Sequence, residues 1–311
     1  MIRRFLPALA VAVALGGGAV LTMGCMNPTK KQVKQEPRPA KPGKAKAPKG
    51  GGGDASDASL YDDKGEHTVM VDVDGEKIPV SMYVPSKRKS NTLVVLIHGS
   101  GGSGPGTFRS MSMGSFHEKK GVVVMAPSAA PYPKSGRPRW NSGNFEETWR
   151  NDLQLLENLG KAARESGKVD KIVAVGFSNG AQMTNRWACE GTQVDAIITG
   201  AGTLAVPPKN CKRSIPNRTY VGDKDFRMDE SPEEDGHVPS VKDTMALWKK
   251  INNCKDTPPT SDRKGRRVCH TWDCETPTAM CIVNGLAHKY PTDDNCGVDA
   301  NEESWDFLEI E

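Results

Sequence analysis

The sequence predicts an α/β domain with a mainly parallel central sheet flanked by helices, because strand and helix patterns alternate along most of its 311 residues. Residues 92–97 are almost entirely aliphatic, as expected of a strand buried on both faces of a parallel sheet. Residues 171–175 repeat this pattern and lead directly into residues 179–189, whose apolar side chains have helical spacing. Parallel strands need such helical crossovers, so helices should cover both faces of the sheet.

An antiparallel hairpin is expected before the parallel strands. Residues 67–74 and 77–85 alternate apolar and polar side chains, and the turn between them contains Asp74 and Gly75. An Asp-Gly pair between two alternating segments is a strong hairpin pattern. We therefore expect these two strands to form the N-terminal, antiparallel edge of the sheet.

The rest of the body continues the alternation. A buried strand is expected at residues 122–125, and apolar residues at helical spacing predict a helix over 146–165. Residues 60–311 are long enough for one large α/β catalytic domain, and a single domain is the simplest organisation. The later predicted elements are strands at 196–200 and 217–221, a helix at 241–252, and two last strands at 268–272 and 279–283 before a polar tail.

Residues 1–24 resemble a secretory signal peptide. Arg3 and Arg4 precede an apolar run, residues 5–15, that is short for a membrane span and is followed by glycines. Residues 21–25, LTMGC, resemble the cleavage site of bacterial lipoproteins, although Thr22 stands where an aliphatic residue is usual. We expect cleavage before Cys25, lipidation of this cysteine and anchoring to the bacterial cell envelope. Simple secretion is the alternative.

Residues 25–59 are expected to form a disordered basic tether. Between residues 26 and 53 there are seven Lys, Arg38, one Glu and five Pro, so the segment cannot bury enough apolar surface to offset its ordering entropy. Its cations could rest on anionic lipid head groups, or it could be a solvated spacer.

The charge is divided unevenly along the chain. Of the net charge of +4, the leader carries +2 and the stretch 26–53 carries +7, which leaves −5 for the body. An acidic body argues against a nucleic-acid partner. The sequence leaves the oligomeric state open, and we expect a monomer.

Seven cysteines follow Cys25. In an exported protein they are expected to form disulfides, and no spacing among them resembles a zinc site, so no metal is predicted. Because the number is odd, at least one cysteine must remain outside the intramolecular bridges.

A nucleophilic serine is indicated by the pentapeptide GFSNG at residues 176–180. It follows a predicted buried strand and opens a predicted helix, which is the context of a G-x-S-x-G nucleophile elbow. The glycines permit a tight turn that lifts Ser178 clear of the sheet and directs the first helical amides toward a developing oxyanion. A serine in an ordinary turn is the alternative, but the flanking strand and helix favour the nucleophile.

Such a serine needs a base and the base needs a carboxylate, in the chain order Ser, Asp, His. Asp223 and Asp225 both follow a predicted strand, and position alone does not separate them. Among the later histidines, His237 lies in an acidic loop, where it is expected to be solvated. His270 lies within a predicted strand, where a structural role is expected. His288 follows the last predicted strand in a loop that can reach the carboxyl edge of the sheet, so it is the favoured base.

A glycine-rich loop, HGSGG at residues 98–102, follows the first buried strand. The backbone amides of Gly99 and Ser100, together with that of Asn179, are the expected oxyanion donors, because glycines let a backbone approach a substrate closely. A phosphate-binding loop is the rival interpretation, but the Gly-Lys-Ser/Thr ending and the dinucleotide spacing are absent. His98 itself is expected to be structural.

These motifs resemble those of a family of secreted α/β-hydrolase esterases, the polyhydroxybutyrate depolymerase-like and feruloyl or acetyl-xylan esterase-like enzymes. The similarity spans residues 92–291 and is most specific at GFSNGAQM, residues 176–183. The resemblance implies an α/β-hydrolase fold, and the family's Gly-x-x-Asp motif, here residues 222–225, selects Asp225 over Asp223. The other matching segments are HGSGG at 98–102, RWNSG at 139–143, NDL at 151–153 and ACE at 188–190.

The family's histidine motif, Gly-x-Gly-His-x-Trp-Pro, is matched by GLAHKYP at residues 285–291. His288 is retained. Ala287 replaces a glycine and Tyr290 replaces a tryptophan, so the pocket around the base is expected to differ from that of the family.

The resemblance also implies two disulfides beside the site, Cys189 with Cys211 and Cys254 with Cys274. Each could stabilise the fold by about 3 kcal/mol through loop closure. The other cysteines have no family counterpart, so one further bridge and one remaining thiol are expected among Cys269, Cys281 and Cys296.

Some residues near these motifs are candidates for substrate binding. Trp140, Asn141 and Trp149 could line a sugar or aromatic subsite, although large apolar side chains beside a helix are more often core residues. Tyr290 is a further candidate because it follows the predicted base. Asp152 resembles a family aspartate near the active-site face, with a carboxylate on the helix surface as its alternative.

Together these residues predict a serine carboxylic-ester hydrolase. Ser178 would attack the ester carbonyl, His288 would transfer the proton and Asp225 would orient the imidazole, without a metal or an organic cofactor. The resemblance implies acetyl or feruloyl esters of polysaccharides, or hydroxyalkanoate oligomers of the polyhydroxybutyrate type, as substrates. The alternatives are a serine peptidase on the same fold and a non-catalytic, surface-anchored binding module.

Overall fold

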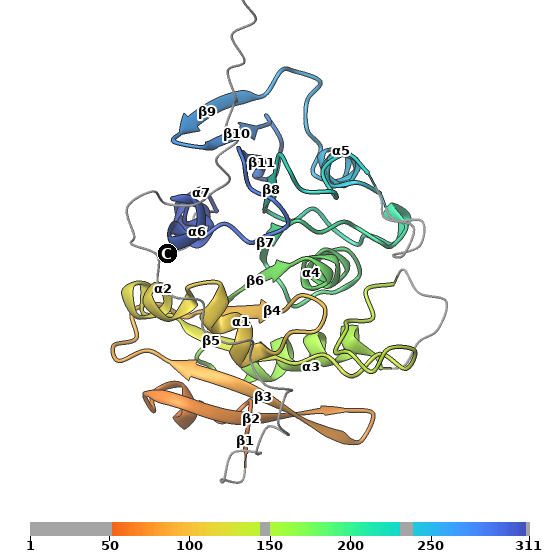
Figure 1. Cartoon of the computed structure of the whole chain (residues 1–311). Coiled ribbons are helices and arrows are strands. Elements are labelled where there is room, and N and C mark those ends of the chain that lie inside the picture. The colour runs from red at the N-terminus through yellow and green to blue at the C-terminus, as the bar shows by residue number, and fades with distance from the viewer. Residues whose placement is uncertain (1–51, 144–149, 231–238, 309–311) are drawn as a thin grey trace, which may run out of the picture.

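The computed structural model describes residues 52–143, 150–230 and 239–308. Within these residues the strands form one sheet (Figure 1). They are β1 (Gly53–Asp54), β2 (Gly65–Val73), β3 (Glu76–Val84), β4 (Thr92–Ile97), β5 (Val123–Pro127), β6 (Lys171–Phe177), β7 (Ala196–Gly200), β8 (Asn217–Gly222), β9 (Thr260–Lys264), β10 (Arg267–Thr271) and β11 (Thr278–Val283). Their order across the sheet is β1-β2-β3-β5-β4-β6-β7-β8-β11-β10-β9.

The centre of the sheet is parallel, as the sequence predicts. β5, β4, β6, β7, β8 and β11 pair in parallel, whereas hairpins extend the sheet in antiparallel fashion at both ends. The expected N-terminal hairpin is β2–β3, and both residues of its turn, Asp74 and Gly75, have positive φ angles. Two positive φ angles give the turn the twist that matches its strands. β1 pairs with the outer side of β2.

Helices cover both faces of the sheet, and the side chains of each strand alternate between them. The helices are α1 (Gly104–Ser110), α2 (Met113–Lys120), α3 (Asp152–Glu165), α4 (Asn179–Glu190), α5 (Val241–Ile251), α6 (Asp293–Cys296) and α7 (Ala300–Phe307). Leu93, Val95 and Ile97 of β4 pack in the core under α3, α4 and α5, whereas Val94 and Leu96 pack with residues of α1, α2 and α7. None of the described helices is long and apolar enough to span a membrane.

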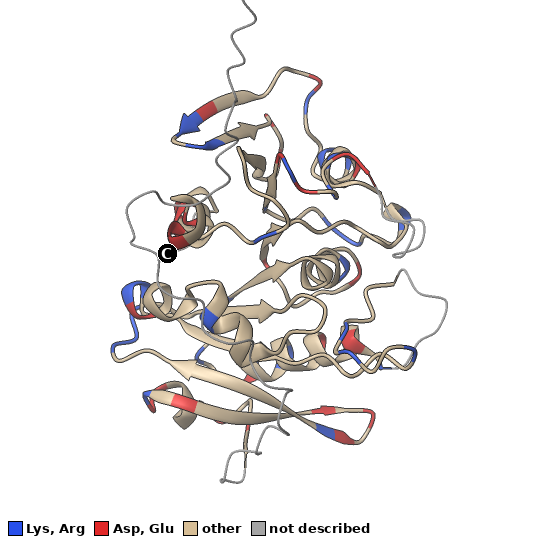
Figure 2. Cartoon of the chain, in the orientation of Figure 1, with Lys and Arg blue, Asp and Glu red and all other residues tan. Residues whose placement is uncertain are grey.

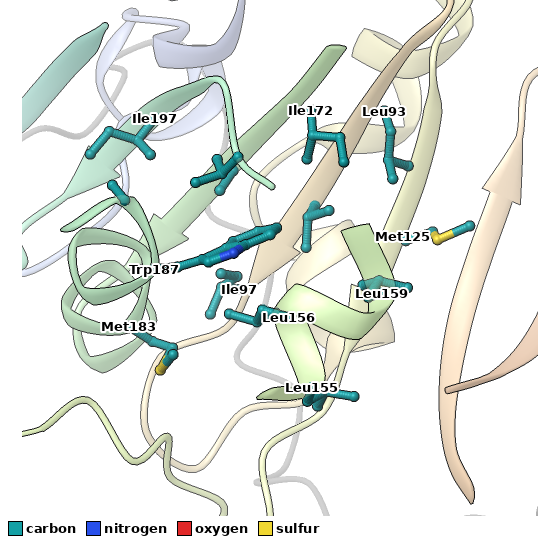
Figure 3. Packing of buried hydrophobic residues seen from close by; sticks show 14 of the residues in the cluster. Leu93, Ile97, Met125, Leu155, Leu156, Leu159, Ile172, Met183, Trp187 and Ile197 are labelled. Atoms are coloured by element: carbon teal, nitrogen blue, oxygen red, sulfur yellow. The ribbon is translucent and has the colours of Figure 1, made fainter. Parts of the chain in front are cut away.

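Trp187 of α4 lies at the centre of the core that α3, α4 and α5 cover. Its ring is fully buried, and Figure 3 shows it beside Ile97 of β4 and Leu156 of α3. Its indole Nε1 also donates a hydrogen bond to Glu157 Oε1 at 2.7 Å. This side chain therefore joins α4, whose first residue follows Ser178, to the neighbouring helix and to the sheet.

The folded body begins earlier than the expected residue 60. Gly53 pairs with β2, Ala55 is fully buried, and the Tyr61 hydroxyl donates to the Ala55 carbonyl at 2.7 Å. The sequence does not reveal this start, because the segment is polar and rich in glycine. The buried side chains of Ala55 and Tyr61 hold it to the rest of the domain. The leader and the tether up to residue 51 lie outside the described residues.

Two other predicted boundaries differ from the structure. α3 begins at Asp152 rather than at residue 146, with Asn151 as its N-cap, whose side chain accepts from the Gln154 N–H at 3.1 Å. The first expected turn, 146–149, lies outside the described residues. The expected polar tail contains α6 and α7, and α7 is held to the sheet by the buried ring of Trp305.

Disulfides close three loops of the described chain. Both pairs that the resemblance implied are present, and the additional bridge joins the neighbouring strands β10 and β11. Cys296 keeps its thiol, which lies 3.7 Å from the Thr292 carbonyl oxygen. The pairs are Cys189–Cys211, Cys254–Cys274 and Cys269–Cys281.

Replacing Trp187 with alanine should lower the free energy of unfolding by about 3–5 kcal/mol, because it empties the centre of the core between α3, α4 and β4. Trp187→Phe keeps most of the apolar volume and should cost less. Urea unfolding followed by circular dichroism measures both. Lys161→Ala, at an exposed site on α3, is the control and should change stability by less than about 0.5 kcal/mol. Equal losses for Trp187→Ala and the control would contradict the assigned role.

Candidate active site

Ser178 stands at the turn between β6 and α4. Its backbone has φ 55° and ψ −123°, a strained conformation for a residue with a side chain. The chain around it leaves no space for other side chains: a Cβ added at Gly176 would lie 2.3 Å from Thr184 Oγ1, and one at Gly180 would lie 2.1 Å from the Ile97 carbonyl oxygen. Gly176 is therefore required by the close approach of α4, and Gly180 by the close packing of this turn against the end of β4.

The loop after β11 brings His288 to Ser178. Its Nε2 lies 2.9 Å from Ser178 Oγ, and its Nδ1 lies 2.9 Å and 3.1 Å from the two carboxylate oxygens of Asp225. An ionised carboxylate can only accept, so Nδ1 carries the hydrogen and Nε2 is left to accept from the serine hydroxyl. The Asp225 side chain is fully buried, whereas 25% of the His288 side chain is exposed. The three side chains form a hydrogen-bonded chain from a buried carboxylate to a hydroxyl group.

The structure separates the two aspartates that the sequence left open. Asp225 contacts the imidazole, whereas Asp223 Oδ1 accepts a hydrogen bond from the Gly285 N–H at 2.6 Å. The two loops also touch at Gly222, where an added Cβ would lie 1.8 Å from the Leu286 carbonyl oxygen. Asp223 therefore holds the loop that carries His288 and does not contact the imidazole itself.

Backbone amides that could stabilise an oxyanion lie beside Ser178. A Cβ added at Gly99 would lie 3.4 Å from Ser178 Cβ, so the glycine loop is in contact with the serine. Within the described part of the chain, the N–H groups of Gly99 and Ser100 have no hydrogen-bond acceptor. Asn179 is the first residue of α4, and the first N–H groups of a helix have no intrahelical acceptor. Gly99 thus lies beside Ser178, Asn179 follows Ser178 in the chain, and Ser100 follows Gly99 in the glycine loop that lines the cavity.

His98 has a structural position, as the sequence predicts. Its Nδ1 lies 2.7 Å from the Gly99 carbonyl oxygen, and its Nε2 accepts from the Ala129 N–H at 2.9 Å. A carbonyl must accept and an N–H must donate, so the ring is neutral with its hydrogen on Nδ1. Burial lowers the pKa of His98 to about 4. The neutral ring holds the start of the glycine loop to the segment that follows β5.

Trp140 and Asn141 do not line the site, which corrects their expected role in substrate binding. Trp140 is fully buried, its Nε1 donates to the His98 carbonyl at 2.8 Å, and its N–H donates to Asn179 Oδ1 at 2.8 Å. Asn141 is also buried, and its N–H donates to Asp152 Oδ2 at 2.7 Å. Since both are covered and their polar groups are used internally, they support the glycine loop and the serine turn and cannot stack on a substrate.

Asp152, which accepts from the Asn141 N–H, is buried and is not a carboxylate on the helix surface. Its side chain is fully buried and lies 2.5 Å from the Arg150 guanidinium. Burial raises the pKa of the Asp152 carboxyl group, and the Arg150 charge opposes this effect. The ion pair contacts the segment that contains Trp140, because Asp152 accepts from the Asn141 N–H and the Arg150 guanidinium lies 5.8 Å from the Trp140 ring centroid.

The other candidates lie away from Ser178 or outside the described residues. His270 is on β10 and its Nδ1 lies 2.8 Å from Ser261 Oγ. Trp149 and His237 fall in the two internal segments that the structure does not describe. Among the described residues, no group of three His, Cys, Asp or Glu side chains is arranged to hold a metal ion.

A cavity of about 440 Å³ adjoins His288. It is lined by the glycine loop 99–102, by Phe177 and Met111, and by Tyr290, a residue predicted to contact the substrate. The Tyr290 hydroxyl donates a hydrogen bond to Asn301 Oδ1 at 2.7 Å. This volume lies within the range of pockets for small molecules, so one part of a small substrate fits here.

The chain has the α/β-hydrolase fold. It aligns with an acetyl xylan esterase from Aspergillus awamori at a TM-score of 0.56 and 17% identity, covering 75% of this chain and 94% of that one. An esterase from Pyrococcus furiosus aligns at 0.52 and 15% identity, covering 78% and 92% of the two chains. Poly(aspartic acid) hydrolase-1 from Sphingomonas sp. KT-1 aligns at 0.51 and 14% identity, covering 78% and 97%. No protein-family model and no curated protein sequence matches the chain.

The buried neutral state of His98 predicts a dependence of stability on pH. The pKa of His98 is about 4 in the folded protein and about 6.5 in an unfolded chain, so only the unfolded state gains this proton between these values. Stability should therefore fall as the pH decreases from 6.5 to 4, with His98 contributing about 3 kcal/mol of the loss. Urea unfolding at several pH values should show a smaller decrease for His98→Asn than for the wild type. Parallel curves for the two proteins would contradict this assignment.

Proposed function

We propose that this protein is a serine carboxylic-ester hydrolase that uses Ser178 as nucleophile, His288 as general base and Asp225 as the group that orients the imidazole. The observation that carries the proposal is the hydrogen-bonded chain between these side chains, with Ser178 at a strained strand-to-helix turn. The α/β-hydrolase fold, shared with an acetyl xylan esterase and another esterase, also supports it.

In the acylation step, Ser178 Oγ attacks the ester carbonyl carbon while His288 Nε2 accepts the hydroxyl proton. The carbonyl π electrons move to the oxygen, and the amides of Gly99, Ser100 and Asn179 stabilise the resulting oxyanion. The tetrahedral intermediate then collapses. Its alcohol oxygen leaves with the C–O bonding electrons and takes the proton from His288, and the acyl group remains on the serine.

In the deacylation step, water takes the place of the departed alcohol. His288 Nε2 accepts a proton from the water as its oxygen attacks the acyl carbon, and the same proton returns to Ser178 Oγ when the acid leaves. Throughout both steps Asp225 keeps the hydrogen on Nδ1 and stabilises the imidazolium. The cycle needs no cofactor.

The proposed substrates are acetyl or feruloyl esters linked to polysaccharides, or hydroxyalkanoate esters. The family resemblance of the motifs and the fold shared with an acetyl xylan esterase support this class. The similarity to a poly(aspartic acid) hydrolase supports a second candidate, cleavage of an amide bond by the same three residues. Comparing p-nitrophenyl acetate with an aspartyl peptide would distinguish the two.

We also propose that the protein is exported and anchored by a lipid on Cys25, with residues 26–51 as a spacer between the membrane and the folded body. The sequence LTMGC supports cleavage before Cys25, and three disulfides are typical of an oxidising compartment. The proposed contacts of the chain are thus its ester substrate and, through the anchor, the membrane.

Lipidation predicts that Cys25→Ala moves the protein out of the membrane fraction of a bacterial cell. A radiolabelled fatty acid should label the wild type and not this variant, because the thiol is the acceptor. Cys296→Ala, which leaves Cys25 intact, is the control and should be labelled like the wild type. Fatty-acid labelling of Cys25→Ala would contradict the proposed anchor.

The proposed mechanism predicts sharply different effects at neighbouring positions. The wild type should react with a fluorophosphonate probe and hydrolyse p-nitrophenyl acetate, whereas Ser178→Ala should do neither. Asp225→Asn should lower kcat by about 10⁴-fold, because an asparagine amide in place of the carboxylate holds the wrong imidazole tautomer. Asp223→Asn is the matched control: its side-chain oxygen can still accept from Gly285, so activity should stay close to that of the wild type.

Urea unfolding of each variant excludes loss of fold as the cause. A folded wild type with neither labelling nor turnover would disprove the proposed function. Equal losses in Asp223→Asn and Asp225→Asn would disprove the separate roles of the two aspartates.

A further inference from the structure

Phe226 stands out because of its exposure. Among the described residues it is the one large hydrophobic side chain that is exposed, at 52%. It is also next to Asp225 in the chain, and its ring centroid lies 4.7 Å from that of His288. It is the position of this exposed ring beside the proposed base, and not its exposure alone, that makes Phe226 a candidate for contact with the substrate.

The Phe226 ring is held in position despite its exposure. The turn on which it lies is fixed by two hydrogen bonds, from the Asp225 N–H to the Gly222 carbonyl at 3.1 Å and from the Arg227 N–H to Asp225 Oδ1 at 2.9 Å. The Arg227 guanidinium lies 5.4 Å from the ring centroid, and Arg227 is itself buried. The ring is thus presented to solvent by a turn that the buried carboxylate holds.

A second phenyl ring contacts the same imidazole from the cavity side. The Phe177 centroid lies 4.9 Å from that of His288, and Phe177 lines the cavity together with the glycine loop and Tyr290. Phe226 is not among the residues that line this cavity. The imidazole therefore has one aromatic neighbour in the cavity and another on the exposed surface.

The chemistry of acyl transfer assigns the two halves of an ester to these two regions. The acyl half stays bound while the alcohol half leaves, and water must then reach the same position beside His288 Nε2. The exposed side suits the alcohol half, because it leaves first and water must enter in its place while the acyl half is still bound. The acyl half then lies beside the glycine loop, in the cavity, where the oxyanion donors are.

We propose that Phe226 is the contact for the alcohol half of the substrate and selects alcohols that present a flat apolar face, either an aromatic ring or the C–H face of a sugar ring. This inference rests on the proposed function. An aromatic or C–H contact is the interaction expected, because Phe226 offers the exposed part of a ring that is already fixed and loses little freedom on binding.

The test compares two acetyl esters that differ only in the alcohol. For the full-length wild type and for Phe226→Ala, kcat/KM is measured on benzyl acetate and on methyl acetate. Phe226→Ala should lower the ratio of kcat/KM for benzyl over methyl acetate about 5- to 10-fold, as expected for the loss of one aromatic contact. The rate on methyl acetate should change little. Phe226→Tyr and Phe226→Trp should keep the wild-type ratio, whereas Phe226→Leu should lower it.

Met111→Ala provides the reciprocal control, since Met111 lines the cavity. This variant should change the preference for methyl butanoate over methyl acetate and leave the ratio of benzyl to methyl acetate unchanged. Phe226→Ala should lower the ratio of benzyl to methyl acetate and leave the preference for methyl butanoate over methyl acetate unchanged. The two variants together would then assign the cavity to the acyl half and Phe226 to the alcohol half.

Three results would overturn the inference. An unchanged ratio of benzyl to methyl acetate in Phe226→Ala would exclude contact with the alcohol. An equal loss on both esters with a shifted pH profile would show that Phe226 only positions His288. A changed acyl preference in Phe226→Ala would place the acyl half on this ring. In each case fluorophosphonate labelling of Ser178 in the wild type would keep the proposed function intact, whereas loss of labelling and of all turnover in the wild type would remove both.

Discussion

The site depends on one close contact, the packing of the turn at Ser178 against the end of β4. Gly180 comes so near the Ile97 carbonyl that a side chain has no space, and Ser178 is left with a positive φ. A conformation of this kind costs of order 1–3 kcal/mol and persists only where the surroundings hold it. Here β6 is paired on both sides in the sheet, and α4 is fixed through the fully buried ring of Trp187. The stability of the core thus maintains the strain that exposes the serine hydroxyl.

Two further sets of contacts bring partners to this turn. On one side, Asp223 and Gly222 join the loop after β8 to the loop after β11, so Asp225 and His288 arrive together. Both loops follow strands whose carboxyl ends lie at the same edge of a parallel sheet, where ligand sites of such folds occur. On the other side, the buried Trp140 holds both the glycine loop and the start of α4, because its Nε1 donates to the His98 carbonyl and its main-chain N–H donates to Asn179 Oδ1. Figure 2 shows that the ribbon of β4 and β6, the central strands beneath the site, is almost free of charged residues.

The predictability of each element followed its burial. β4, β6 and β7 were predicted nearly residue for residue, because strands buried on two faces must be apolar throughout. β9 was missed, since all five of its residues are exposed and polar, and only pairing with β10 makes it a strand. The start of the fold at Gly53 was missed for a similar reason. A few long-range contacts hold a segment whose composition is that of a linker.

By itself, the sequence determined the alternation of strands and helices, the turn at Ser178 and the choice of His288, because local spacing and residue type carry that information. The choice of Asp225 needed the family resemblance, and the reason for it is visible only in three dimensions, where Asp223 bonds to Gly285. Tertiary structure also decided that Trp140 is a buried support and that Phe226 is exposed beside the imidazole. The physical reason is that burial and hydrogen-bond partners depend on segments far apart in the chain, which no local pattern records.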